Sequence, residues 1–117
     1  MKTNEVYLHH ILDAIRRIES YTQGIDQARF ENEPMRQDAV IRQIEIIGEA
    51  SRQLSRSFQE QHDAIPWADI IAMRNRIAHD YMNVDLDVAW EVVRYDLPDL
   101  KLHVERILEA GGHSPTE

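Results

Sequence analysis

The chain has 117 residues, which fits one domain with a core of its own. Its net charge of −8 argues against a general nucleic-acid coat, because such proteins neutralise phosphates with a broad basic surface. The absence of cysteine excludes disulfides, thiol catalysis and cysteine-ligated zinc.

The cations are almost all arginine, since lysine occurs only at Lys2 and Lys101. Arginine binds phosphate or carboxylate groups through paired hydrogen bonds. Local arginine clusters on an acidic chain suggest a small anion site or a basic protein partner. From composition alone, ordinary surface charge remains the simpler interpretation.

The first residues, "MKTNEVYLHHILDAIRR", lack the uninterrupted apolar segment of a signal peptide. No apolar run reaches membrane-spanning length, so we expect a cytoplasmic protein with no membrane partner. Gaps of three and four residues predict a first helix, which Gly24 is placed to end. Its apolar stripe consists of Leu8, Ile11, Leu12, Ile15 and Ile18.

A second long helix is predicted from the stripe Val40, Ile44, Ile47, Ser51, Leu54 and Phe58. Gly48 lies inside this helix, where glycine costs about 1 kcal/mol relative to alanine. We therefore expect another backbone to pack closely against Gly48, which would make this helix central. The preceding acidic stretch, "QARFENEPM", is expected to be loose.

A third helix is predicted over "IPWADIIAMRNRIAHDY", with Pro66 in its first turn. Its stripe would be Trp67, Ile70, Ile71, Arg74, Ala78 and Tyr81. Asn83 and Asp85 are predicted as turn and cap residues. A fourth helical run has the apolar residues Leu86, Ala89, Trp90, Val93 and Leu97. Pro98 should break or kink this helix. The last stripe ends at Gly111 and Gly112: Leu100, Val104, Ile107 and Leu108.

No stretch alternates convincingly between apolar and polar residues, as a half-buried strand would. The predicted fold is therefore all-α, an up-and-down helical bundle of four long helices plus a shorter helix. Residues 1–110 are expected to form a single helical domain, and residues 111–117 a flexible C-terminal tail.

Arg74 occupies a position on the predicted apolar stripe. A buried unpaired charge costs several kcal/mol, so Arg74 needs a partner, an interface or a cleft. One interpretation is a buried ion pair with Glu45 or Glu49. His79 lies about 140° around a continuous helix from Arg74, so the two side chains would not touch. They could meet if the helix ends near His79, or if two chains meet across a dimer axis.

An arginine and a histidine at one phosphate would suit metal-free RNA cleavage. Arginine can hold the phosphate and stabilise its developing charge, and histidine can move protons near neutral pH. Taken alone, His79 near a helix end is more often a surface or capping residue.

The remaining candidate motifs are weak. No metal-ligand spacing relates His9, His10, His62, His103 and His113. There is no glycine-rich phosphate loop, H-E-x-x-H motif or G-x-S-x-G elbow. We therefore expect no metal and no cofactor. Trp67 and Trp90 lie on apolar stripes, which favours core positions over base-stacking ones.

Arg74, His79 and Tyr81 together form an R-x4-H-x-Y motif, and Asn75 follows the arginine. Three blocks occur in order: "IEIIGEA" (44–50), "IPWADIIAMRNRIAHDY" (65–81) and "VAWEVVRYDLPDLK" (88–101). On these residues the chain resembles HEPN domains of the HepT type, from the first helix to about Leu108. The resemblance implies a HEPN-type helical bundle that forms a homodimer.

The same resemblance implies the toxin of a type VII-like toxin–antitoxin system, a metal-independent endoribonuclease with a composite site at the dimer cleft. Arg74 and His79 would be catalytic. Asn75 would support them. Arg76 is a further supporting candidate for a different reason, since it shares a helix face with His79, as Asn75 does. Tyr81 would be AMPylated by a cognate MntA-type nucleotidyltransferase antitoxin that uses ATP. The added negative charge would then repel RNA.

Two other interpretations remain open. The chain could be a non-catalytic helical subunit that binds nucleotide or presents substrate to a partner nucleotidyltransferase, as its acidic charge suggests. It could also be a purely structural helical dimer with Arg74 in an internal ion pair.

Overall fold

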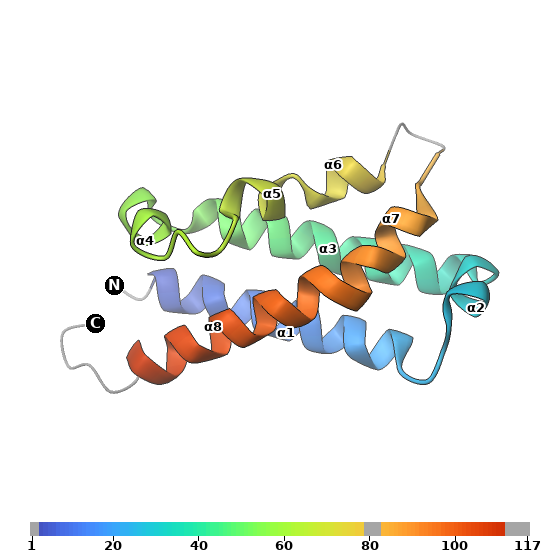
Figure 1. Cartoon of the computed structure of the whole chain (residues 1–117), viewed down its shortest axis with the longest axis horizontal. Helices are drawn as coiled ribbons and strands as arrows, with labels where there is room; N and C mark the ends of the chain where they lie inside the picture. Colours follow the sequence, from blue (N-terminus) through green and yellow to red (C-terminus); the bar gives the residue numbers. More distant parts are fainter. Residues whose placement is uncertain (1–2, 79–82, 112–117) are drawn as a thin grey trace.

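The computed structural model describes residues 3–78 and 83–111, and this part of the chain is helical, as predicted (Figure 1). Three long rods lie side by side: α1 (Thr3–Thr22), α3 (Pro34–Gln53), and a continuous rod of α7 (Leu86–Glu91), η1 (Val92–Asp96) and α8 (Leu97–Gly111). Short helices α2 (Gln27–Glu31) and α4 (Arg56–Gln61) flank α3, and α5 (Trp67–Ile71) and α6 (Met73–Ile77) run along it. The tail beyond Gly111 lies outside the described residues.

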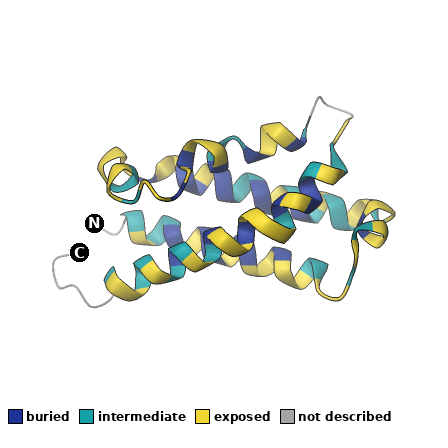
Figure 2. Cartoon of the chain, viewed as in Figure 1, coloured by how far each residue is buried: buried dark blue, intermediate teal, exposed yellow. Residues whose placement is uncertain are grey.

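The core lies between the three rods. Figure 2 shows buried residues on the faces that the rods turn toward one another and exposed residues on the outer faces. The whole predicted stripe of α1 is buried, from Leu8 to Ile18. The helix ends at Thr22, and Gly24 follows with a φ of 76°, a left-handed conformation that glycine adopts readily. No helix in the described part of the chain is long and apolar enough to cross a membrane.

Helix α3 is central, and Gly48 explains how α5 packs against it. A Cβ atom at Gly48 would lie 3.2 Å from the backbone oxygen of Ile71, so the predicted close approach is confirmed. The prediction that this helix continues to Phe58 is wrong. The backbone is extended at Leu54, with ψ of 141°, and the Ser55 hydroxyl accepts a hydrogen bond from the Phe58 amide to cap α4.

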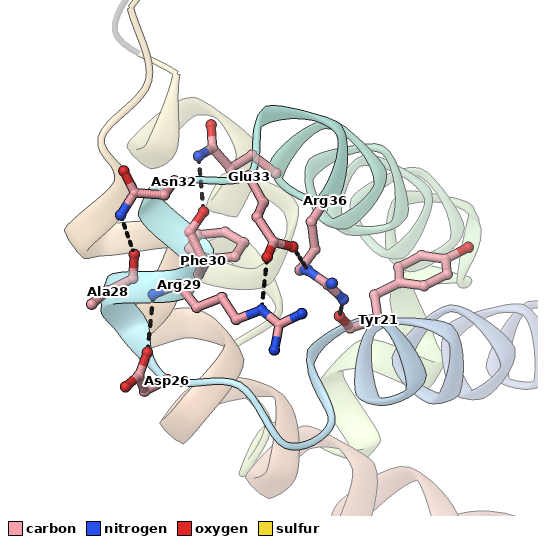
Figure 3. Close-up of polar contacts among 9 residues, drawn as sticks. Tyr21, Asp26, Ala28, Arg29, Phe30, Asn32, Glu33 and Arg36 are labelled. Carbon is pink, nitrogen blue, oxygen red and sulfur yellow. Dashed lines mark hydrogen bonds and ion pairs between the residues drawn. The ribbon is translucent and has the colours of Figure 1, made fainter.

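The stretch expected to be loose instead forms helix α2, whose N-terminus is capped by Asp26. Phe30 of α2 is fully buried, and the centroid of its ring lies 5.3 Å from that of Trp90. Figure 3 shows Arg29 and Arg36 converging on Glu33, with nitrogen–oxygen distances of 2.7 and 2.5 Å. Hydrogen bonds from Arg29 and then Arg36 lower the pKa of Glu33.

The long C-terminal rod begins at Leu86. Asp85 precedes it as the N-cap residue, and its side chain accepts a hydrogen bond from the Val88 amide, as its predicted cap role requires. Of the break or kink expected at Pro98, the break does not occur, because η1 runs directly into α8. Immediately before it the rod adopts a π-helical turn, in which the Leu97 amide donates to the Val92 oxygen five residues back. Pro98 follows as the second residue of α8, and the helical path continues through it.

Candidate functional site

The segment that carries Arg74 is two short helices rather than one. Helix α5 ends at Ile71 and α6 begins at Met73, with Ala72 shared between them as a cap residue. The buried residues of this segment are Trp67, Ile70, Met73 and Ile77. The prediction that Arg74 belongs to the apolar stripe is therefore wrong, because after the break Met73 and Ile77 face the core. The expected core position of Trp67 is confirmed.

Arg74 is half-exposed, with 49% of its side chain accessible, and it pairs with a glutamate of α3. Its Nε atom donates a hydrogen bond to Oε2 of Glu45 over 2.9 Å. The other carboxylate oxygen of Glu45 lies 3.5 Å from Nη1 of Arg42. One of the two ion pairs considered from sequence is thus present, but at the surface instead of in the core. Because this ion pair uses the Nε atom of Arg74, the Nη1 and Nη2 atoms remain as further hydrogen-bond donors.

Arg74 and Asn75 line an open hollow of about 320 Å³ between α3 and the α5–α6 segment. We call it the α3–α6 hollow, and its lining residues are Arg42, Glu45, Gly48, Glu49, Arg52, Ile71, Arg74 and Asn75. Three arginines face two glutamates here, so the hollow is locally positive on a chain whose net charge is −8. A locally cationic recess with exposed guanidinium groups can hold an anion such as a phosphate.

Arg76 lies elsewhere. Its Nη2 atom is 3.0 Å from Oδ2 of Asp96 in the π-helical turn, and it lines a second recess between α5, α6 and α8. Of the two predicted supporting residues, the structure therefore brings Asn75 to the hollow of Arg74 and does not bring Arg76. The supporting role of Arg76 stays a prediction.

The helix ends shortly before the motif histidine. Helix α6 stops at Ile77, and Ala78 is extended, with φ of −93° and ψ of 107°. Ala78 forms an isolated antiparallel bridge with Val84, and the Asp85 amide donates to the Ile77 oxygen over 2.7 Å. Of the two arrangements considered for Arg74 and His79, a helix that ends near His79 is thus present. His79 and Tyr81 themselves lie outside the described residues.

Within residues 3–78 and 83–111, no group of three or more His, Cys, Asp or Glu side chains is arranged to hold a metal ion. The groups of the α3–α6 hollow that can bind a phosphate are the arginines. Sequence reasoning missed two of them, Arg42 and Arg52. A signal was available, because Arg42, Glu45, Glu49 and Arg52 recur at gaps of three, four and three and so share one face of a helix.

Comparisons with known proteins agree on one family. A family model described as "Ribonuclease HepT-like" matches residues 11–107. The chain is 36% identical to "Putative RNase TTE0752" of Caldanaerobacter subterraneus over 93% of its own length and 97% of that protein. It is 39% identical to "Probable ribonuclease HepT" of Thermococcus cleftensis over 91% of its own length and 96% of that protein.

A longer relative also matches, the "Gamma-glutamylcyclotransferase and putative RNase MJ0434" of Methanocaldococcus jannaschii, at 44% identity. The match covers 92% of the chain but only 49% of that protein, so the chain spans about half of its length. No solved structure gives a significant match.

Proposed function

Because the chain belongs to the HepT-like ribonuclease family, we propose that it is a metal-independent endoribonuclease. The observation that carries the proposal is the α3–α6 hollow, where Arg74 and Asn75 of the motif face solvent in a locally positive recess. Arginine is suited to bind a phosphodiester and to stabilise the charge that develops on it during cleavage.

The proposed chemistry uses the RNA itself as the nucleophile. The ribose 2′-oxygen attacks the adjacent phosphorus, the bond to the 5′-oxygen breaks, and a 2′,3′-cyclic phosphate and a 5′-hydroxyl form. One proton leaves the 2′-hydroxyl and one is delivered to the leaving oxygen, and histidine can perform both transfers near neutral pH. His79 is the proposed proton carrier, and the Nη atoms of Arg74 would bind the phosphate.

The two proton transfers support a dimer. Each chain has one motif histidine, so two copies would supply an acid and a base to one phosphate. We therefore propose a homodimer with a composite site, in which the R-x4-H motifs of both chains face a common cleft. The exposure of Arg74 and Asn75 fits this arrangement, because residues that serve a shared cleft must be accessible in the single chain.

The proposed biological role is that of a toxin in a type VII-like toxin–antitoxin system. A cognate MntA-type nucleotidyltransferase would transfer AMP from ATP to the hydroxyl of Tyr81. The product would carry a phosphodiester charge and a nucleoside two residues from His79, and both would oppose RNA binding. Intact mass after co-expression with the antitoxin should rise by one or more AMP units. An unchanged mass, or the same increase in Tyr81→Phe, would remove this part of the proposal.

The central experiment compares RNA cleavage by wild type, Arg74→Ala, His79→Ala and the control Arg16→Ala in the presence of a chelator. Arg16 is an exposed arginine of α1 whose ion pair partner, Glu105, lies on α8, away from the hollow. We expect cleavage by wild type and the control, and loss of cleavage in the two motif variants. Intact RNA with wild type, or equal cleavage by all four proteins, would contradict the proposal.

The alternative is a non-catalytic subunit of a two-component nucleotidyltransferase. The net charge of −8 favours it, because a broad basic surface is lacking. It predicts that RNA stays intact with wild type, while nucleotidyl transfer by the partner depends on this chain.

A further inference from the structure

Two arginines outside the R-x4-H motif share the α3–α6 hollow with Arg74. Arg42 and Arg52 both belong to α3, and 69% and 59% of their side chains are exposed. The glutamates between them, Glu45 and Glu49, occupy the same helix face. The hollow therefore continues along α3 on both sides of Glu45 and Glu49, with a cation at each end.

The spacing of the two arginines matches a nucleic-acid strand. Ten residues separate Arg42 from Arg52, which corresponds to about 15 Å along a helix axis at 1.5 Å per residue. A stacked strand advances roughly 3.4 Å per nucleotide, so this length spans about four nucleotides, and fewer in an extended strand. A strand held by Arg74 would thus have further phosphates within reach of both residues.

The ion pairs in the hollow differ in length. Arg74 pairs closely with Glu45 at 2.9 Å, whereas Arg42 lies 3.5 Å from Glu45 and Arg52 lies 3.9 Å from Glu49. Long, exposed ion pairs contribute little, since solvent screens them and the side chains lose entropy on pairing. Arg42 and Arg52 can therefore exchange their glutamates for phosphates at little cost, while Glu45 keeps Arg74 in place.

We propose that Arg42 and Arg52 bind the backbone phosphates of single-stranded RNA on either side of the phosphate held by Arg74. The strand then runs along α3, and its bases are not read by these contacts. The inference rests on the proposed function and adds the path of the substrate. A single strand is specified because proteins bind unpaired RNA through such charged grooves, whereas duplex RNA is recognised by its helical shape.

The test measures the affinity of the full-length protein for a single-stranded, mixed-sequence 2′-O-methyl oligoribonucleotide at several salt concentrations. This probe lacks the 2′-hydroxyl nucleophile and stays intact. Arg42→Gln/Arg52→Gln should bind roughly tenfold more weakly at low salt, because two exposed charge pairs are lost. The slope of log affinity against log salt should become shallower by about 1.4, or about 0.7 for each phosphate contact.

The matched control is Arg16→Gln/Arg17→Gln, which removes the same charge from exposed positions of α1. Its slope should equal that of wild type. Glu49→Gln should bind the probe more tightly than wild type, because a carboxylate that is 70% exposed in the hollow is neutralised. Urea denaturation should give similar midpoints for all variants, since each substitution is at an exposed side chain.

The outcomes separate this inference from the proposed function. If wild type binds the probe and cleaves RNA while the Arg42/Arg52 variant keeps the wild-type slope, the phosphate path is wrong and the ribonuclease stands. If the salt slope becomes shallower by the same amount in both double variants, it depends on the total charge of the protein and not on these positions, and the phosphate path is again wrong. If Arg42→Gln/Arg52→Gln loses as much affinity for a duplex probe as for the single strand, the assignment to single strands is overturned. No binding and no cleavage by wild type overturns both.

Discussion

Glu45 on α3 accepts a hydrogen bond from Nε of Arg74 on α6 over 2.9 Å, across 29 positions in the sequence. This contact fixes the direction of the guanidinium that we propose as the phosphate ligand. We predict that Glu45→Ala lowers kcat roughly tenfold or more, because a misplaced catalytic group is costly. KM should stay the same or fall, because a negative charge leaves the hollow.

The measurement is steady-state RNA cleavage by Glu45→Ala, Glu45→Gln and wild type. Glutamine retains an oxygen that can accept from Arg74, so Glu45→Gln should recover part of kcat. A raised KM with unchanged kcat would instead mean that Glu45 helps to bind RNA and does not orient Arg74.

Gly48 is the second predicted point of sensitivity. Gly48→Ala gains about 1 kcal/mol of helix propensity, but overpacking against a fixed neighbour costs about 1–3 kcal/mol. The neighbour is the backbone oxygen of Ile71 at 3.2 Å, which cannot rotate away as a flexible side chain could. We therefore expect a net loss of roughly 1 kcal/mol in the free energy of unfolding, measured by urea denaturation. A stabilised variant would mean that α5 moves freely away from α3.

Phe30 tests whether α2 is part of the fold. The side chain is fully buried against Trp90, so Phe30→Ala should lower the free energy of unfolding by about 3–5 kcal/mol. Met35 is 87% exposed nearby in the sequence, and Met35→Ala should change stability by less than about 0.5 kcal/mol. Equal, small effects in thermal and urea unfolding would indicate that α2 is detached from the core.

Glu33 should contribute a pH-dependent part of the stability. Its folded pKa lies below the ordinary value of 4.5 because Arg29 and Arg36 hydrogen-bond to the carboxylate. A lowered pKa means that the stabilisation is present above pH 4.5 and disappears as the pH falls through the folded pKa. Hydrogen bonding to Glu33 raises the pKa of Arg29 further above its already alkaline value, so Arg29 stays charged throughout this acidic window and adds nothing to the pH dependence.

The measurement is the urea midpoint of wild type and Glu33→Gln at neutral pH and at about pH 3. At neutral pH wild type should be more stable than Glu33→Gln, and the difference between their urea midpoints should shrink in acid. Glu109→Gln, at an exposed position of α8, serves as the control. A difference between wild type and Glu33→Gln that grows in acid would contradict the sign.

Much of the fold follows from local patterns. The sequence predicts the stripe of α1, the end of that helix near Gly24, the close approach at Gly48 and the cap at Asp85, because each depends on a few neighbouring residues. The end of α3 was missed although Ser55 is a good N-cap residue, since the apolar spacing continues to Phe58 without interruption.

Other features depend on contacts between distant residues. Helix α2 has only five residues and one buried side chain, Phe30, so it is too short to show an apolar period in the sequence. Its stability comes from the packing of Phe30 against the core. The break at Ala72 has no glycine or proline to announce it. Without that break the spacing placed Arg74 on the buried stripe, although its pairing with Glu45 was considered from sequence.

The π-helical turn at Val92–Asp96 has a consequence for how this chain is compared with its relatives. A π turn accommodates one more residue than the α-helical path it replaces, and one residue corresponds to about 100° of rotation. A relative that keeps the packing of both Trp90 and Leu100 but has a regular α-helix here must be one residue shorter. When such a relative is aligned with this chain, the one-residue gap therefore belongs inside this helix and not in the neighbouring loops, although gaps are usually placed in loops.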